Sequence, residues 1–109
     1  MEQLKNLATE LISTLCNTEL SIEALPIFER DLKRLKKKRA DKSKLIEVVT
    51  ELANNRILAP KYKDHQLQGK LKEFRECHIE DNWLLIYKKD KTKLILVLIR
   101  TGTHDEVLR

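Results

Sequence analysis

The three histidines are the residues of this chain best suited to proton transfer near neutral pH. They are His65, His78 and His104, and all lie in the C-terminal half of the 109 residues. An unperturbed imidazole has a pKa of about 6.5. One histidine could therefore take the proton of an RNA 2′-hydroxyl while another protonates the leaving 5′-oxygen. Arg75 and Arg100 flank the histidines and could stabilise the phosphorane charge. The alternative is that all three histidines are ordinary surface or turn residues.

A zinc site is the rival chemistry for the same histidines. They are separated by 13 and 26 residues (65 to 78, and 78 to 104), whereas zinc ligands are usually closely spaced. The two cysteines, Cys16 and Cys77, lie far apart and without CxxC spacing. They indicate free thiols in a reducing compartment. The sequence therefore predicts neither a metal nor a cofactor.

A basic cluster, residues 33–39, stands at the end of a predicted helix. Six of its seven residues are Lys or Arg, which is more charge than the helix dipole needs. The net charge of +5 and the pI near 9.3 suit a polyanion or an acidic protein. We expect a surface for the phosphate backbone of RNA. The predicted RNA-contacting residues are Lys33, Arg34, Lys36, Lys37, Lys61, Lys63, Lys70 and Arg75.

Hydrophobic periodicity predicts a helix, a strand, two helices and then a meander of three strands. The helices span residues 2–17 and 26–39, with a third from Asp41 or Ser43 to about residue 54, and a loop covers 54–70. The strands span residues 20–25, 71–79, 83–88 and 94–100. The last strand is almost continuously apolar, which is typical of a central strand. This order predicts an α+β domain, with a helical hairpin on one face of a small antiparallel sheet.

The N-terminal segment, residues 1–18, is predicted to be an extra amphipathic helix ahead of a domain at 19–109. Its apolar stripe must pack on something, because so short a helix is marginal in water. This stripe could pack on the core of the domain, on a second copy of the chain or on a partner protein. No signal peptide is visible, and the longest apolar run, Leu94–Ile99, is too short to cross a membrane. We expect a soluble, cytoplasmic protein.

Three sequence motifs resemble those of YafQ-type toxins in the RelE superfamily. They are Tyr62–Gly69 (YKDHQLQG), then Arg75–His78 (RECH) with Trp83–Lys88 (WLLIYK), and finally Arg100–His104 (RTGTH). Their order and spacing match over roughly residues 20–108. The resemblance implies a RelE-like fold and metal-independent cleavage of mRNA in the ribosomal A site, beside 16S rRNA. It also implies neutralisation by an antitoxin protein encoded beside the toxin.

The resemblance also assigns roles to individual residues. His65, His78 and His104 match the three active-site histidines of the family, and Arg100 matches the arginine of its closing motif. With Asp81 they form the predicted catalytic set. His65 and His104 are expected to be the acid and base, without a decision between them.

Two positions depart from the family pattern. Asn82 stands where the family has an aspartate before the tryptophan, and Asp81 lies one residue earlier. Either Asp81 takes the role, or the acid is dispensable, or activity is reduced. Leu108 replaces an aromatic residue near the C-terminus. These departures support the alternative of a weak or inactive module that binds antitoxin or RNA without cleaving.

Overall fold

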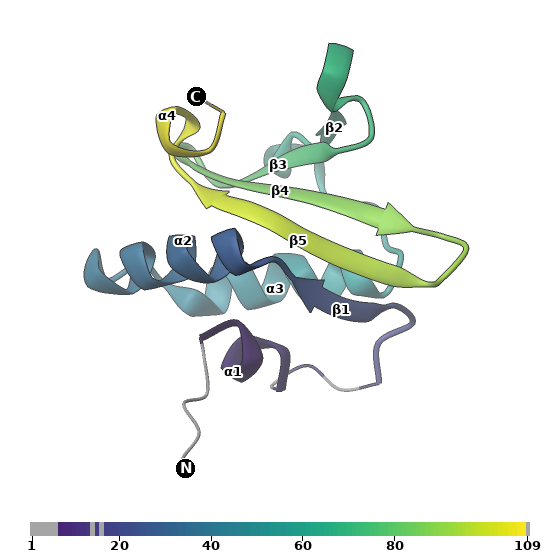
Figure 1. The fold of residues 1–109 in the computed structure, drawn as a ribbon, viewed down its shortest axis with the longest axis horizontal. Helices are drawn as coiled ribbons and strands as arrows, with labels where there is room; N and C mark the ends of the chain where they lie inside the picture. Colours follow the sequence, from purple (N-terminus) through teal and green to yellow (C-terminus); the bar gives the residue numbers. More distant parts are fainter. Residues whose placement is uncertain (1–6, 14, 16, 109) are drawn as a thin grey trace.

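The computed structural model describes residues 7–13, 15 and 17–108 and shows helices packed on a five-stranded sheet (Figure 1). Helices α2 (Pro26–Lys37) and α3 (Lys42–Ala53) lie together on one face of the sheet. The strand order is β1 (Ser21–Ala24), β5 (Ile95–Gly102), β4 (Trp83–Asp90), β3 (Arg75–Glu80) and β2 (His65–Gln66). The predicted α+β class and the helical hairpin on one face are confirmed.

The two long helices begin where their capping residues place them. Pro26 occupies the first turn of α2, where a missing N–H costs nothing. The side chain of Asp41 accepts a hydrogen bond from the Ser43 N–H at 3.0 Å and caps α3. The hairpin buries its apolar residues against one face of the sheet, and these residues include Phe28, Leu32, Leu45, Val48, Val49 and Leu52.

The sheet is mixed, whereas the sequence predicted an antiparallel one. Strands β3, β4 and β5 pair antiparallel as expected, but β1 pairs parallel with β5, from Ser21 opposite Ile95 to Ala24 opposite Leu98. No tight turn joins β1 to its neighbour, so only tertiary packing sets its direction. The central position predicted for the last strand is confirmed, because β5 lies between β1 and β4.

The segment predicted as a loop at 54–70, with a strand from residue 71, has more local structure than expected. It contains two 3₁₀ turns, η1 (Pro60–Tyr62) and η2 (Gly69–Leu71), with the short strand β2 between them. Gly69 has a φ of +63°, and backbone hydrogen bonds such as Lys72 N–H to Gly69 C=O keep the chain curled. Strand β3 therefore begins only at Arg75.

Helix α1 (Leu7–Ser13) is the described part of the helix predicted at 2–17, and residues 1–6, 14 and 16 lie outside the description. Ala8 and Leu11 are buried in the main core. The Ala8 N–H donates a hydrogen bond to the Glu29 carboxylate of α2 at 2.6 Å. In the part of the chain described here, no helix is long and apolar enough to span a bilayer.

The C-terminal end of β5 extends past β1. There a side chain of α2 accepts the backbone hydrogen bond that a neighbouring strand would otherwise accept. The carboxylate of Asp31, which is fully buried, accepts the Thr101 N–H at 3.0 Å. The same carboxylate pairs with the Arg100 guanidinium through Nε at 2.8 Å and Nη2 at 3.1 Å. Arg34 adds a third cationic contact at 3.2 Å. Asp31 thereby replaces the missing strand neighbour and fixes Arg100.

Candidate active site

Two of the three histidines lie together on the sheet face away from the helical hairpin. Strand β3 alternates, so that Arg75 and Cys77 point toward the hairpin while Glu76 and His78 point away. His65 of β2 lies opposite Glu76 in the antiparallel pair. Burial raises the pKa of the Cys77 thiol on the hairpin side to about 12, which suits a packing role.

A buried carboxylate, Glu76, lies between the two histidines. Its Oε1 is 3.2 Å from Nε2 of His65 and 3.9 Å from Nε2 of His78. The residue is only 5% exposed, and its Oε2 has no hydrogen-bond partner among the described residues. Glu76 was not among the residues predicted to form the site. Its position in the sequence could have predicted this role. Glu76 stands two residues before His78, and residues two apart on a strand share a face of the sheet.

His65 is held at both ring nitrogens. Nδ1 lies 2.7 Å from the carbonyl oxygen of Lys63, which can only accept, so Nδ1 donates. Nε2 faces Glu76, as described above. The backbone of Lys63 has a φ of +49°, which turns this carbonyl toward the ring. The imidazole is 49% exposed, so a substrate can reach the ring, and proton transfer requires one of these two contacts to open.

His78 opens onto a hollow of about 270 Å³ that several predicted site residues line. Lys61 and Lys63 come from the η1 turn, and Asp81 comes from the turn that joins β3 to β4. A register shift between His78 and Glu80 marks a β-bulge at this point, and bulges re-aim side chains beside active sites. Lys44 and Glu47 of α3 and Glu80 of β3 line the hollow as well, so it combines one imidazole with three ammonium groups and three exposed carboxylates.

His104 lies on the same face but is not in contact with the other two histidines. It opens α4 (His104–Val107), which a capping box between Thr103 and Glu106 starts. His104 was predicted to lie in a turn. The Thr-x-x-Glu spacing of residues 103–106 is the sequence signature of a capping box, which predicts the start of a helix. Val107 packs on Leu84 and Ile86, the residues beside Glu76 and His78.

The pairing of the strands gives an approximate distance from His78 to Gly102, which stands two residues before His104. His78 lies opposite Leu84, and Leu84 lies opposite Gly102. Two strand spacings therefore separate His78 from Gly102, which is roughly 10 Å. Among the described residues, no hydrogen bond or ion pair joins His104 to His65 or His78. A substrate phosphate could bridge an opening of this size.

Arg100 belongs to the buried ion pair with Asp31 and does not touch the histidines. Its hydrogen bonds to Asp31 raise the pKa of the guanidinium. Its Nη2 also donates to the Glu106 carbonyl of α4 at 3.1 Å. The side chain is 22% exposed. Arg100 therefore anchors the helix that carries His104, and its predicted contact with phosphate stays a prediction.

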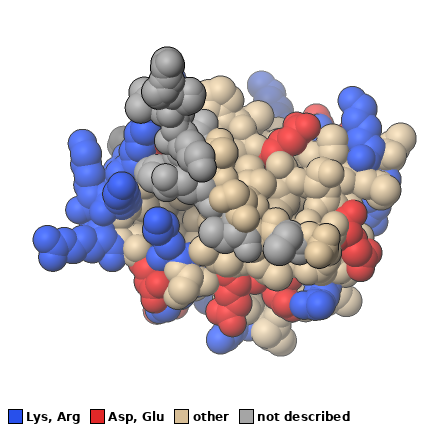
Figure 2. Space-filling model, turned by 90° about the horizontal axis from the view of Figure 1, so that it is seen from below, with Lys and Arg blue, Asp and Glu red and all other residues tan. Residues whose placement is uncertain are grey.

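The predicted RNA-contacting lysines divide into two groups, and Arg75 stands apart. Lys33, Lys36 and Lys37 are exposed on α2, and Figure 2 shows Lys and Arg side chains gathered at that end of the molecule. Arg34 is half-buried against Asp31 and Glu106. The second group is Lys61 and Lys63, which line the hollow beside His78, together with Lys70 of η2, and all three are exposed. Arg75 points to the hairpin face, where it pairs with Asp64.

A metal centre was the rival reading of the histidines. In the described ranges 7–13, 15 and 17–108, no three His, Cys, Asp or Glu side chains gather as a metal-ligand set would. The chemistry that this arrangement offers is proton transfer by imidazoles beside cationic side chains.

Comparison with known proteins places this chain among bacterial toxins. The family model described as "Bacterial toxin of type II toxin-antitoxin system, YafQ" matches residues 20–109. The chain is 44% identical over 78 residues to the mRNA interferase toxin YafQ of Escherichia coli K12, covering 71% of this chain and 83% of the relative. This chain belongs to the YafQ family of type II toxin–antitoxin toxins, as its three motifs predicted.

Solved structures of the family share the fold. A metal-bound toxin from Helicobacter pylori is 48% identical with a TM-score of 0.77, over 81% of this chain and 98% of that one. The E. coli DinJ–YafQ toxin–antitoxin complex contains a chain that is 38% identical with a TM-score of 0.76, over 84% and 99%. The RelE/YafQ-like fold expected from sequence is confirmed.

Proposed function

We propose that this chain is a toxin that cuts mRNA on the ribosome without a metal ion. The observation that carries the proposal is the pair of histidines held against one buried carboxylate, beside a hollow that lysines and carboxylates line. Positioned acids and bases each accelerate such reactions by roughly 10²–10⁴-fold. Membership of the YafQ family and the similarity to an mRNA interferase support the same conclusion.

The proposed reaction is a transfer within the RNA strand. One histidine of the His65 and His104 pair takes the proton of the 2′-hydroxyl, whose oxygen attacks the phosphorus. The other gives a proton to the departing 5′-oxygen. His78 and Asp81 line the phosphate site, and Arg100 stabilises the charge on the scissile phosphate. The products are a 2′,3′-cyclic phosphate, or its 3′-phosphate, and a 5′-hydroxyl.

Glu76 is proposed as the residue that positions the imidazoles. Its carboxylate holds the ring of His65 on one side and faces His78 on the other. Carboxylates that orient histidines in this way fix the tautomer and the ring plane. Lys61 and Lys63 supply positive charge beside this group, where the backbone of mRNA would pass.

The proposed partners are mRNA, the 16S rRNA of the A site and a cognate antitoxin in the cytoplasm. The exposed lysines of α2 offer phosphate contacts that need no base recognition. Lys38 bonds to Glu106 at 3.2 Å and so links this basic end to the helix that carries His104. An E. coli relative has been solved in complex with its antitoxin.

Induced expression in bacteria tests the proposed activity. We expect growth arrest with new mRNA ends for the wild type, and neither for His104→Ala at equal protein level. The ends should carry 2′,3′-cyclic or 3′-phosphates, and cleavage by ribosomes in vitro should persist in EDTA. Ends with 3′-hydroxyls, or loss of cleavage on chelation, would contradict the mechanism.

A weak or inactive binding module is the second candidate function, and Asn82 favours it. An amide cannot exchange a proton as a carboxyl group does. We expect Asn82→Asp to change cleavage less than about threefold if Asp81, which lines the hollow, already acts. A large gain in the rate of mRNA cleavage would show that the natural site is impaired. The matched control is Asn17→Asp, at an exposed position that lines neither hollow.

Residues 1–18 are proposed as an addition to the toxin domain at 19–109 that packs on the core. Removing residues 1–18 would expose the surface that Ala8 and Leu11 cover. We expect the free energy of unfolding to fall by about 2 kcal/mol. Chemical denaturation measures this change, and sedimentation tests self-association. A truncated chain of unchanged stability and the same oligomeric state would count against both packing and self-association.

A further inference from the structure

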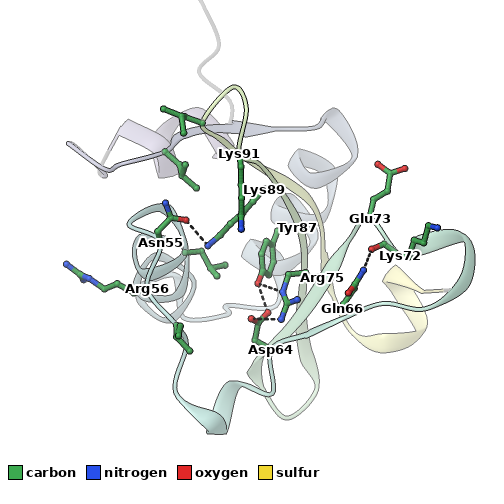
Figure 3. Close-up of a pocket in the computed structure, with 14 residues that line it drawn as sticks. Asn55, Arg56, Asp64, Gln66, Lys72, Glu73, Arg75, Tyr87, Lys89 and Lys91 are labelled. Carbon is green, nitrogen blue, oxygen red and sulfur yellow. Dashed lines mark hydrogen bonds and ion pairs between the residues drawn. The ribbon is translucent and has the colours of Figure 1, made fainter.

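A second and larger hollow lies on the other side of β2 and β3 from the histidines. It has a volume of about 840 Å³. One wall is the turn after α3, with Arg56 and Ile57, and the other is formed by Arg75, Tyr87 and Lys89 of the sheet (Figure 3). Because strand residues alternate, Asp64 and Arg75 face this groove while His65 and Glu76 face the active site. The two sites share a wall.

The floor of the groove is a closed polar network. The Asp64 carboxylate accepts hydrogen bonds from Nη2 of Arg75, at 3.0 Å, and from the Tyr87 hydroxyl. Arg75 Nε also donates to the Tyr87 oxygen at 3.3 Å. Tyr87 is 1% exposed, and burial raises the pKa of its phenol. The charge of Asp64 is therefore already satisfied by Arg75 and Tyr87.

Two lysines at the mouth of the groove lack such a partner. Nζ of Lys89 donates a hydrogen bond to the Asn55 side-chain oxygen at 3.3 Å. Within the part of the chain that is described, no carboxylate oxygen lies within 4.0 Å of the Lys89 or Lys91 ammonium group. Burial lowers the pKa of Lys89, the charge of Asp64 opposes this shift, and the charge of Lys91 adds to it. A half-buried ammonium without a direct ion pair is costly, and an incoming carboxylate would relieve the cost.

The rim of the groove is apolar, and its side chains are highly exposed to solvent. Ile57 is 96% exposed and Leu94 is 55% exposed. Leu94 also has a φ of +58°, in the left-handed region that a leucine rarely occupies. Strained backbone of this kind concentrates at functional positions. The groove therefore offers cations and aliphatic surface side by side.

We propose that this groove binds an acidic segment of the antitoxin, with carboxylates on Lys89 and Lys91 and an aliphatic side chain against Ile57 and Leu94. The proposal rests on the proposed function of the chain as a toxin. Charge complementarity identifies the partner as acidic. Single-stranded RNA fits less well, because it binds largely by stacking on aromatic rings, and the one aromatic residue among the described lining residues, Tyr87, is buried.

Two variants, one that reverses charge and one that adds a charge to the apolar rim, test the proposal by titration calorimetry of the purified toxin with the antitoxin encoded beside it. Lys89→Glu/Lys91→Glu should weaken binding by about 100-fold or more, because like charges would replace opposite ones. Ile57→Asp should weaken it by about 10-fold. The matched control, Arg30→Glu/Lys42→Glu, makes the same change at two exposed positions outside the groove and should bind as the wild type does.

Cleavage is measured separately for every variant, and this separates the two proposals. Mutants that cut mRNA normally but escape the antitoxin support the groove. An unchanged dissociation constant for both groove variants would overturn it, as would loss of cleavage with normal antitoxin binding, which would make the groove an RNA site. A wild type that binds the antitoxin but never cuts mRNA would overturn the proposed activity alone.

Discussion

Replacing Asp31 with alanine should lower the free energy of unfolding by about 3–5 kcal/mol, the usual cost of breaking a buried ion pair. The carboxylate is fully buried and receives Arg100 through two nitrogens, the Thr101 N–H and Nη1 of Arg34. Its loss leaves Arg100 and an edge N–H of β5 without their acceptor. Urea denaturation followed by circular dichroism measures the effect.

The matched control is Asp105→Ala, which removes an exposed carboxylate from α4 and should change stability by less than about 0.5 kcal/mol. A second variant separates lost charge pairing from lost packing. Asp31→Leu/Arg100→Met removes both charges and should be more stable than Asp31→Leu alone, because no unpaired guanidinium remains. A fall below 1 kcal/mol for Asp31→Ala would show that water replaces the carboxylate at the end of β5.

Loss of the His65 imidazole should reduce the rate of mRNA cleavage by roughly 10²–10⁴-fold. Glu76→Gln should reduce it by about 10–100-fold, because the carboxylate acts through the rings it orients. In a His65→Ala background, Glu76→Gln should cost much less than it does alone, since its main target is gone. Single-turnover cleavage of a ribosome-bound mRNA gives these rates.

The double-mutant comparison distinguishes positioning from folding. A merely structural Glu76 would lower stability and activity by the same factor in both backgrounds. Additive losses in cleavage would therefore contradict the positioning role. Glu23→Gln, on the exposed face of β1 at the opposite edge of the sheet, serves as the control and should cleave at the wild-type rate.

Local sequence signals predicted the helices and most of the strands of this protein. Pro26 favours the start of α2 through its fixed φ at the first helical position, and Asp41 caps α3 through the Ser43 N–H two residues away. Both signals can be recognised in a linear pattern. The spacing of apolar residues predicted which faces the core would cover. The three motifs predicted the family, because residue identity and order are themselves properties of the sequence.

Tertiary structure decided how those parts meet. Strand β1 pairs with residues 95–98, far along the chain, and Asp31 meets Arg100 across 69 positions. No local pattern specifies such partners, because they depend on how the hairpin packs on the sheet. The same packing makes Arg100 an anchor of α4 through its hydrogen bond to the Glu106 carbonyl, a role that the sequence did not predict.

The candidate site shows the same division. The sequence by itself determined that three histidines and a lysine-rich segment would be present, and that His78 would stand near the end of a strand. Only the pairing of β2 with β3 put Glu76 against His65, and only the bulge after His78 opened the hollow beside Asp81. A side chain's chemistry is fixed by its type, but its partners depend on strand register, which the whole core sets.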